Sequence, residues 1–285
     1  SQAAFRISPA NNGSRPLKLS IGKAWEEASA FLGSEAKLVA PVALATFALP
    51  SILVGLAFPG GMAAGGGAGL MMLLAFVASL WGQMTIVLLA NHWTGSLGQA
   101  LGKAARSLAV LIVAFLLVFV PIILLFSLSL GLLLIGAGMN DPAAIAPAQI
   151  AKIPGVALTL LGLVLVFLFL AARLFLASAV AVMENVGVFA LIKRSWRLTR
   201  GAFLRLLALV VLLLVIQFVL GLAVTTVIGS VAVLAAGELK PFNTSALIVA
   251  VASGLLGAII ASIWAAMAGR VYAQLAGPQA SVPAS

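Results

Sequence analysis

The sequence predicts an all-α protein, a polytopic membrane helical bundle of six transmembrane helices arranged as three hairpins, each preceded by an in-plane amphipathic helix. Its composition points to this class, because 64% of the residues are hydrophobic and only 8% are charged, with a mean hydropathy of +1.25. Several apolar stretches also exceed the roughly 20 residues that a helix needs to cross a bilayer. So little polar surface excludes a water-soluble globule.

Hydropathy divides the chain into six spans joined by short connections. In chain order the spans cover residues 38–58, 69–90, 108–138, 155–182, 204–236 and 246–272. The third and fifth are longer than a bilayer requires, so we expect tilt, kinks or extension beyond the bilayer. Pro41, Pro50 and Pro121 lie inside spans, where each removes a backbone hydrogen bond and favours a kink.

Positive charge is distributed unevenly among the connections. Thirteen of the sixteen Lys and Arg residues lie at the N-terminus, after spans two and four, or at the span ends beside them. The other connections contain only Lys152 and Lys240, and Arg173 lies within a span. The positive-inside rule then predicts a multi-pass protein of the bacterial inner membrane with both termini in the cytoplasm. We expect one membrane domain, residues 17–275, between flexible cytoplasmic termini, residues 1–16 and 276–285.

The connection before span five contains the basic segment LIKRSWRLTR, residues 191–200. Four cations occupy one half of its helical wheel: Lys193, Arg194, Arg197 and Arg200. Trp196 and the aliphatic residues occupy the other half. This pattern predicts a helix in the plane of the membrane surface, with its cations bound to headgroups of anionic phospholipids. Near an anionic leaflet each cation contributes about 1 kcal/mol of attachment.

Two further amphipathic segments precede hairpins in the same way. They are IGKAWEEASAFL, residues 21–32, and LGQALGKAARSL, residues 97–108, and Ser96 with Gln99 forms a capping box before the second. Because indole rings favour the membrane–water interface, we expect three anchors there: Trp25, Trp93 and Trp196.

The short patterns IGKAW, LGQAL and IKRSW also resemble one another, and each begins a unit of amphipathic helix, span, outer loop and span. This order predicts an internal repeat over residues 17–92, 94–184 and 185–275, with the repeats related by an axis normal to the membrane. Chance similarity among amphipathic segments is the alternative.

The stretch RLFLASAVAVMENVGVFALIKRSWRLTRGAFLRLLALVVLLL has an Arg within a span, then a Glu near its cytoplasmic end, and then Ser-Trp, Leu-Thr and Gly before the next span. These features fall at Arg173, Glu184, Gly187, Ala190, Leu191, Ser195, Trp196, Leu198, Thr199 and Gly201. In them the chain resembles the bacterial membrane-domain family named after the membrane portion of certain glycerophosphoryl diester phosphodiesterases. Outside this stretch the resemblance rests on the number of spans and on IGKAWEEASAFL. It implies the six-span architecture but no phosphodiesterase activity, because the catalytic His, Glu and metal-binding carboxylates have no counterparts here.

Arg173 is the one charge that lies far from both ends of a predicted span. It lies about ten residues before the end of this span near Met183, or roughly 15 Å into the membrane at 1.5 Å per residue. A charge at this depth faces the bundle interior or a water-filled cavity and marks function, or it extends toward headgroups or bridges polar groups such as Gln217. Glu184 is too far along the helix to pair with Arg173 directly, and we expect it at the positive start of the third amphipathic helix.

The chain offers little for catalysis. His92 is its only His, it has no Cys, and none of its acidic residues lies inside a predicted span, so we expect no metal site, no cofactor and no enzymatic activity. His92 and Ser96 are four residues apart, but an interfacial His beside Trp93 is the simpler interpretation. The basic segment adjoins a span and the chain has no nucleic-acid module, so we expect no nucleic-acid partner.

Three function classes remain. The first is a non-enzymatic scaffold or lipid-interacting membrane domain, with membrane phospholipids, anionic headgroups preferred, as its partners. The second is a transporter or channel for an anionic or lipid-like substrate, for which Arg173 is the supporting residue. The third is an accessory subunit of a larger membrane complex, with a membrane-protein or cytoplasmic partner.

Overall fold

The structure is a computed structural model that describes residues 19–59, 66–91, 93–138 and 153–277. Within these residues all regular secondary structure is helical, which confirms the all-α prediction. The expected flexible segment 1–16, and all of 276–285 except its first two residues, lie outside this description.

The first two predicted spans follow a separate short helix. The helices in chain order are α1 (Ile21–Ser34), α2 (Ala36–Ala43), the π-helical turn η1 (Leu44–Ala48), α3 (Leu49–Ala57) and α4 (Gly66–Ala90). The π turn lies between Pro41 and Pro50, which lack backbone N–H groups. Inside it, the buried hydroxyl of Thr46 donates a 2.7 Å hydrogen bond to the carbonyl of Val42. Such wide turns are a recognised way for a helix to absorb a local irregularity.

Helix α5 (Leu97–Gly136) is continuous over 40 residues, about 60 Å at 1.5 Å per residue. It begins with the predicted capping box, in which Ser96 and Gln99 each accept the other's backbone N–H. The expected in-plane helix at 97–108 is therefore not a separate element but the first turns of α5. The reason is local, because this segment is rich in good helix formers and contains no proline before Pro121.

The fourth predicted span, residues 155–182, is broken into two helices. Helix α7 (Val156–Leu174) ends at a turn formed by Phe175 and Leu176, and α8 (Ala177–Glu184) follows. Asn185 ends α8 in the left-handed conformation, with φ 48°, which Asn tolerates better than most residues.

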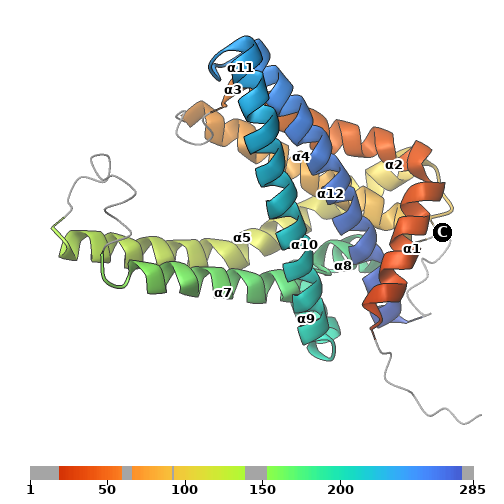
Figure 1. Cartoon of the computed structure of the whole chain (residues 1–285). Helices are drawn as coiled ribbons and strands as arrows, with labels where there is room; N and C mark the ends of the chain where they lie inside the picture. The colour runs from red at the N-terminus through yellow and green to blue at the C-terminus, as the bar shows by residue number, and fades with distance from the viewer. Residues whose placement is uncertain (1–18, 60–65, 92, 139–152, 278–285) are drawn as a thin grey trace, which may run out of the picture.

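The remaining helices are α9 (Val188–Arg200), α10 (Phe203–Ala223), the π-helical turn η4 (Val224–Ile228), α11 (Gly229–Ala236) and α12 (Thr244–Ala276). The side chain of Asn243 caps α12 by accepting the N–H of Ala246 at 2.8 Å. Helix α12 is the central helix, packed against α1, α3, α4 and α11 (Figure 1).

Two glycines set the contact between α12 and α3. A Cβ at Gly254 would lie 2.6 Å from Cγ1 of Ile52 and 3.1 Å from the backbone carbonyl of Ala48. A Cβ at Gly55 would lie 3.1 Å from Cβ of Ala250. Small residues at these positions let the two backbones approach closely, as is common between membrane helices.

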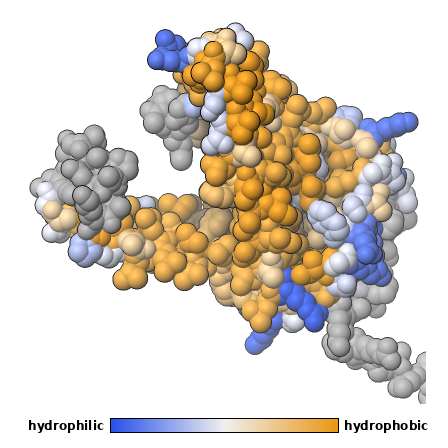
Figure 2. Space-filling view, in the orientation of Figure 1, coloured by the Kyte–Doolittle hydropathy of each residue, from blue (hydrophilic) through white to orange (hydrophobic). Residues whose placement is uncertain are grey.

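Helices α5 and α7 form an arm that extends away from the other helices (Figure 1). Figure 2 shows a hydrophobic surface over this arm and along α10, with hydrophilic residues gathered toward the helix ends. In the arm, Leu124, Leu125 and Leu128 are 62–66% exposed. A surface of this kind is compatible with hydrocarbon rather than water.

Six helical segments within the described residues are long and apolar enough to cross a membrane. They are Ala36–Ala57, Gly67–Ala90, Leu97–Gly136, Val156–Glu184, Phe203–Ala236 and Thr244–Ala276. The protein is thus a multi-pass membrane protein, as its composition predicts.

The order of elements agrees between the first and third predicted units. Each has a separate short helix (α1, α9), a span containing a π turn, and a continuous span (α4, α12). The middle unit differs, because its amphipathic part belongs to α5 and its second span is divided. The three-hairpin arrangement and the internal repeat stay predictions.

Candidate functional site

Helix α9 lies where α5, α7 and α8 come together at the base of α10 (Figure 1). Its buried ridge consists of Leu191, Ser195 and Thr199, each fully enclosed. These residues are four positions apart and therefore share one side of the helix. The ridge fixes which of the other α9 side chains face neighbouring helices and which face outward.

Ser195 joins α9 to the end of α7. Its hydroxyl donates a 2.7 Å hydrogen bond to the backbone carbonyl of Arg173, in the last turn of α7. Carbonyls at a helix C-terminus have no partner within the helix, so this bond satisfies one of them. Thr199 completes the ridge by donating to the carbonyl of Ser195 at 3.0 Å.

The side chain of Arg173 lies within a cage of three aromatic rings. Its Cζ atom is 4.5 Å from the ring centre of Phe203, 5.0 Å from that of Trp196 and 5.4 Å from that of Phe169. Phe169 also contacts both other rings, with centroid distances of 5.6 Å to Trp196 and 5.4 Å to Phe203. All three rings lie within the range of cation–π attraction, about 6 Å. The cage joins α7, α9 and the start of α10.

The structure removes the assumption on which the expected depth of Arg173 was based. The prediction of about ten residues into the membrane assumed one continuous helix to Met183, whereas α7 ends at Leu174. Arg173 is thus a cation in the last turn of a helix, where the negative end of the helix dipole favours it. Neither Gln217 nor any other side chain of the described residues donates or accepts a hydrogen bond with its guanidinium.

The guanidinium nitrogens of Arg173 lack hydrogen-bond partners among the described residues. Nε and Nη1 are enclosed by protein and have no hydrogen-bond partner among the described residues. None of the ion pairs in this part of the chain involves Arg173 either. The residue as a whole is only half-buried, and Nη2 is not among its enclosed nitrogens.

Glu184 forms a polar cluster separate from this cage. Both of its carboxylate oxygens accept hydrogen bonds from Nε of Arg194, at 2.8 and 2.9 Å, and one also accepts from the hydroxyl of Tyr272 at 2.9 Å. The expected place of Glu184 at the start of α9 is wrong, because it is the last residue of α8. Its contacts tie together α8, α9 and α12.

Arg194 is consequently not one of four equivalent outward cations. The exposed basic residues of α9 are Lys193, Arg197 and Arg200. Beside them on the helix lie Phe189, 77% exposed, and Trp196, 38% exposed. We call these five residues the basic–aromatic face of α9.

The other two expected anchors differ in their contacts. Trp25 on α1 is 46% exposed, and its ring is available to an interface. Trp93 instead donates from Nε1 to the carbonyl of Ser96 at 3.1 Å, with Nζ of Lys103 5.4 Å above its ring centre. It therefore supports the start of α5.

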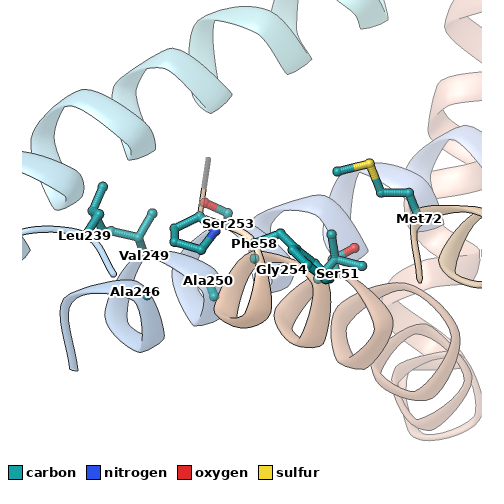
Figure 3. A pocket seen from close by; sticks show the side chains of 12 residues that line it. Ser51, Phe58, Met72, Leu239, Ala246, Val249, Ala250, Ser253 and Gly254 are labelled. Atoms are coloured by element: carbon teal, nitrogen blue, oxygen red, sulfur yellow. The ribbon is translucent and has the colours of Figure 1, made fainter. Parts of the chain in front are cut away.

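A pocket of about 260 Å³ lies between α3 and α12 (Figure 3). Its walls are mainly apolar, including Phe58, Met72 and Val249, with the hydroxyl-bearing residues Ser51 and Ser253 among them. It contains no acid, base or thiol that would support chemistry. His92 lies outside the described residues, and within them no cluster of three metal-ligating side chains is present.

The structure thus brings together Arg173 with Trp196, and Glu184 with Arg194, from the residues that the sequence singles out. Phe169, Phe203 and Tyr272 were not predicted as members of these clusters. Phe169 lies four residues before Arg173, which is the only signal in the sequence that could have associated it with this position.

Comparisons with known proteins place the chain without assigning it a role. No curated protein matches the sequence, and no solved structure matches it. The resemblance to the membrane domain of glycerophosphoryl diester phosphodiesterases stays a prediction. A family model described as a domain of unknown function, DUF7847, matches residues 19–275, which include every helix described above except the last residue of α12. The chain belongs to the DUF7847 family.

Proposed function

We propose that this protein is a non-enzymatic, lipid-interacting membrane domain whose basic–aromatic face of α9 binds anionic phospholipid headgroups. The observation that supports the proposal is the composition of this face. Lys193, Arg197 and Arg200 are exposed beside Phe189 and Trp196, while the opposite side of α9 is buried against other helices. Cations and exposed aromatic rings on one helix are typical of attachment to a membrane surface.

The proposed attachment has two parts. Three cations at headgroup depth contribute about 1 kcal/mol each near an anionic leaflet. The exposed parts of Phe189 and Trp196 add apolar contact with the acyl boundary. Arg194 is left out of this sum because Glu184 already pairs with it.

In this proposal α9 lies at the cytoplasmic surface of a bacterial inner membrane, with both termini on the same side. The support is the distribution of Lys and Arg among the connections. The connection between α11 and α12 contains one cation, Lys240, already paired with Glu238 at 3.6 Å, and lies on the opposite side in this proposal.

The test compares lipid preference between variants. Native mass spectrometry would measure binding of phosphatidylglycerol and phosphatidylcholine to the wild type and to the triple variant Lys193→Gln, Arg197→Gln, Arg200→Gln. We expect the preference for the anionic lipid to fall by on the order of tenfold, because three attractions of about 1 kcal/mol are lost and partly screened in the wild type.

A matched control removes the same charge elsewhere. Lys23→Gln, Lys37→Gln, Lys240→Gln neutralises three exposed cations on other elements and should change the preference much less. If the α9 variant kept the full preference, or if the control lost as much, the specific role of the α9 face would be wrong.

The exposed arm formed by α5 and α7 favours a scaffold for another membrane protein as a second candidate. Helix α5 is about 60 Å long, twice the roughly 30 Å of bilayer hydrocarbon, and its outer leucines are uncovered. Blue-native electrophoresis of native membranes would compare the wild type with Leu124→Ala, Leu125→Ala, Leu128→Ala. Loss of a higher-mass complex in the variant would support the scaffold role, and identical migration would count against it.

A further inference from the structure

The guanidinium of Arg173 is a charged group whose protein contacts leave its hydrogen bonding incomplete. Nε and Nη1 are enclosed without any partner, and none of the described ion pairs includes this residue. Glu184, the next acidic residue after Arg173 in the chain, already accepts hydrogen bonds from Arg194 and Tyr272. Removing an arginine from water without replacing its hydrogen bonds is unfavourable, so an acceptor at Nη2, the guanidinium nitrogen that is not enclosed, would offset part of this cost.

The aromatic cage determines what kind of acceptor fits. Phe169, Trp196 and Phe203 hold the cation in place but supply no oxygen atom. Since Nε and Nη1 are enclosed and Arg173 is only half-buried, Nη2 is the nitrogen that a ligand oxygen can reach directly. An arginine fixed in this way recognises oxyanions, and phosphate in particular, through charge-assisted hydrogen bonds.

We propose that Arg173 binds one phosphate group at the junction of α7, α9 and α10. The phosphate belongs either to a phospholipid headgroup or to free inorganic phosphate, and both present the same oxygens to the guanidinium. The lipid source is supported by exposed apolar side chains on the same helices, Phe189 on α9 and Leu204 on α10, which are 77% and 76% exposed. This site rests on the proposed location of α9 at the membrane surface. It shares Trp196 with the basic–aromatic face, but it does not use the three exposed cations of that face, Lys193, Arg197 and Arg200.

The primary test uses the full chain, delipidated in a phosphate-free detergent solution. Its thermal unfolding midpoint would be titrated with dioctanoyl phosphatidylglycerol in one arm and with inorganic phosphate in the other, against chloride at equal ionic strength. We expect a saturable rise with a single site in at least one arm. A rise with the lipid alone identifies a headgroup ligand, and a rise with phosphate alone identifies the free anion.

Variants then locate the site. Arg173→Gln should weaken the saturable binding by about 10- to 100-fold, the range expected for lost hydrogen bonds to a charged group. Arg173→Lys keeps the charge but not the planar donor geometry, so its affinity should lie in between. The triple variant Lys193→Gln, Arg197→Gln, Arg200→Gln should keep the saturable site within about twofold, since only diffuse attraction is lost.

Two results would overturn the proposal: a wild-type midpoint that responds to neither ligand beyond the chloride control, or an Arg173→Gln protein that binds as tightly as wild type. If Arg173→Gln does not fold, the titrations of the wild type and of Arg173→Lys still show whether Arg173 binds phosphate. The proposed function is tested separately. It would still hold if Arg173 bound no phosphate but the preference for anionic lipid continued to depend on Lys193, Arg197 and Arg200.

Discussion

The hydroxyl of Ser195 donates a 2.7 Å hydrogen bond to the backbone carbonyl of Arg173, which lies 22 residues earlier in the chain. The residues on either side of Ser195 extend this connection. Trp196 contacts the guanidinium of Arg173, and Arg194 pairs with Glu184. Three consecutive residues of α9 therefore attach it to the ends of α7 and α8, and they determine which side of α9 remains exposed.

Removal of the Ser195 hydroxyl should loosen this attachment. Ser195 is fully buried, and Ser195→Ala leaves the carbonyl of Arg173 without its partner, so we expect a loss of about 1–3 kcal/mol in stability. Thermal unfolding in detergent would measure the loss as a lower midpoint. Ser29→Ala is the matched control, because the Ser29 hydroxyl is exposed and bonds only within α1, to the carbonyl of Glu26. A control as damaging as Ser195→Ala would contradict the role given to this bond.

The cluster around Glu184 predicts an ordered series of effects. Glu184→Gln leaves Arg194 without its carboxylate and should cost about 1–3 kcal/mol, because hydrogen bonds to charged groups are the stronger kind. Tyr272→Phe removes one hydrogen bond and should cost less, about 0.5–1.5 kcal/mol for the bond itself. A double-mutant cycle with Glu184→Gln and Arg194→Gln would measure their coupling. Additive losses in this cycle would show that the pair contributes nothing.

Two glycines lie one turn apart on α12, Gly254 and Gly257, and only Gly254 lies close to the preceding helices. Gly254→Ala places a methyl group 2.6 Å from Cγ1 of Ile52 and 3.1 Å from the carbonyl oxygen of Ala48, a backbone atom that cannot move aside easily. We expect destabilisation of about 1–3 kcal/mol from this overpacking. Gly257→Ala is the control, because its new Cβ meets no atom within 4 Å and should be neutral or slightly stabilising. Equal midpoints for the two variants would show that the close approach is absent.

Membrane orientation can be tested by chemical labelling, since the chain has no Cys. Arg197→Cys on α9 and Lys240→Cys between α11 and α12 both introduce exposed thiols. In intact cells a membrane-impermeant maleimide should label Lys240→Cys and leave Arg197→Cys unmodified until the membrane is permeabilised. The reverse pattern would place α9 on the outer side and contradict the proposed topology.

Much of the fold follows from features that act locally along the chain. Continuous hydrophobicity predicts the six spans, and Ser96 with Gln99 predicts the capped start of α5. The wheel of residues 191–200 predicts an amphipathic helix, and these residues do lie in the helix α9, but the wheel cannot distinguish a cation that faces solvent from one that faces another helix. Arg194 illustrates this, because its position on the wheel does not reveal Glu184 as its partner.

The candidate site itself depends on contacts between helices that the sequence does not encode locally. The break after Leu174 has no Pro or Gly to mark it, since Phe175 and Leu176 form the turn. Without this break Arg173 appears to be deep in a span, and Phe203 appears unrelated to it. The cage exists because the end of α7, the middle of α9 and the start of α10 meet at one point.

The depth of α9 in a lipid bilayer tests most directly whether its basic–aromatic face lies at the membrane surface. Spin labels at Phe189→Cys and Arg197→Cys, in vesicles that contain phosphatidylglycerol, would report collision rates with oxygen, which concentrates in the acyl region, and with a water-soluble nickel complex. We expect the label at 189 to lie at the acyl boundary and favour oxygen, and the label at 197 to lie at headgroup level and favour nickel. Strong, equal exposure of both labels to the nickel complex would place α9 in water and contradict its proposed location at the membrane surface.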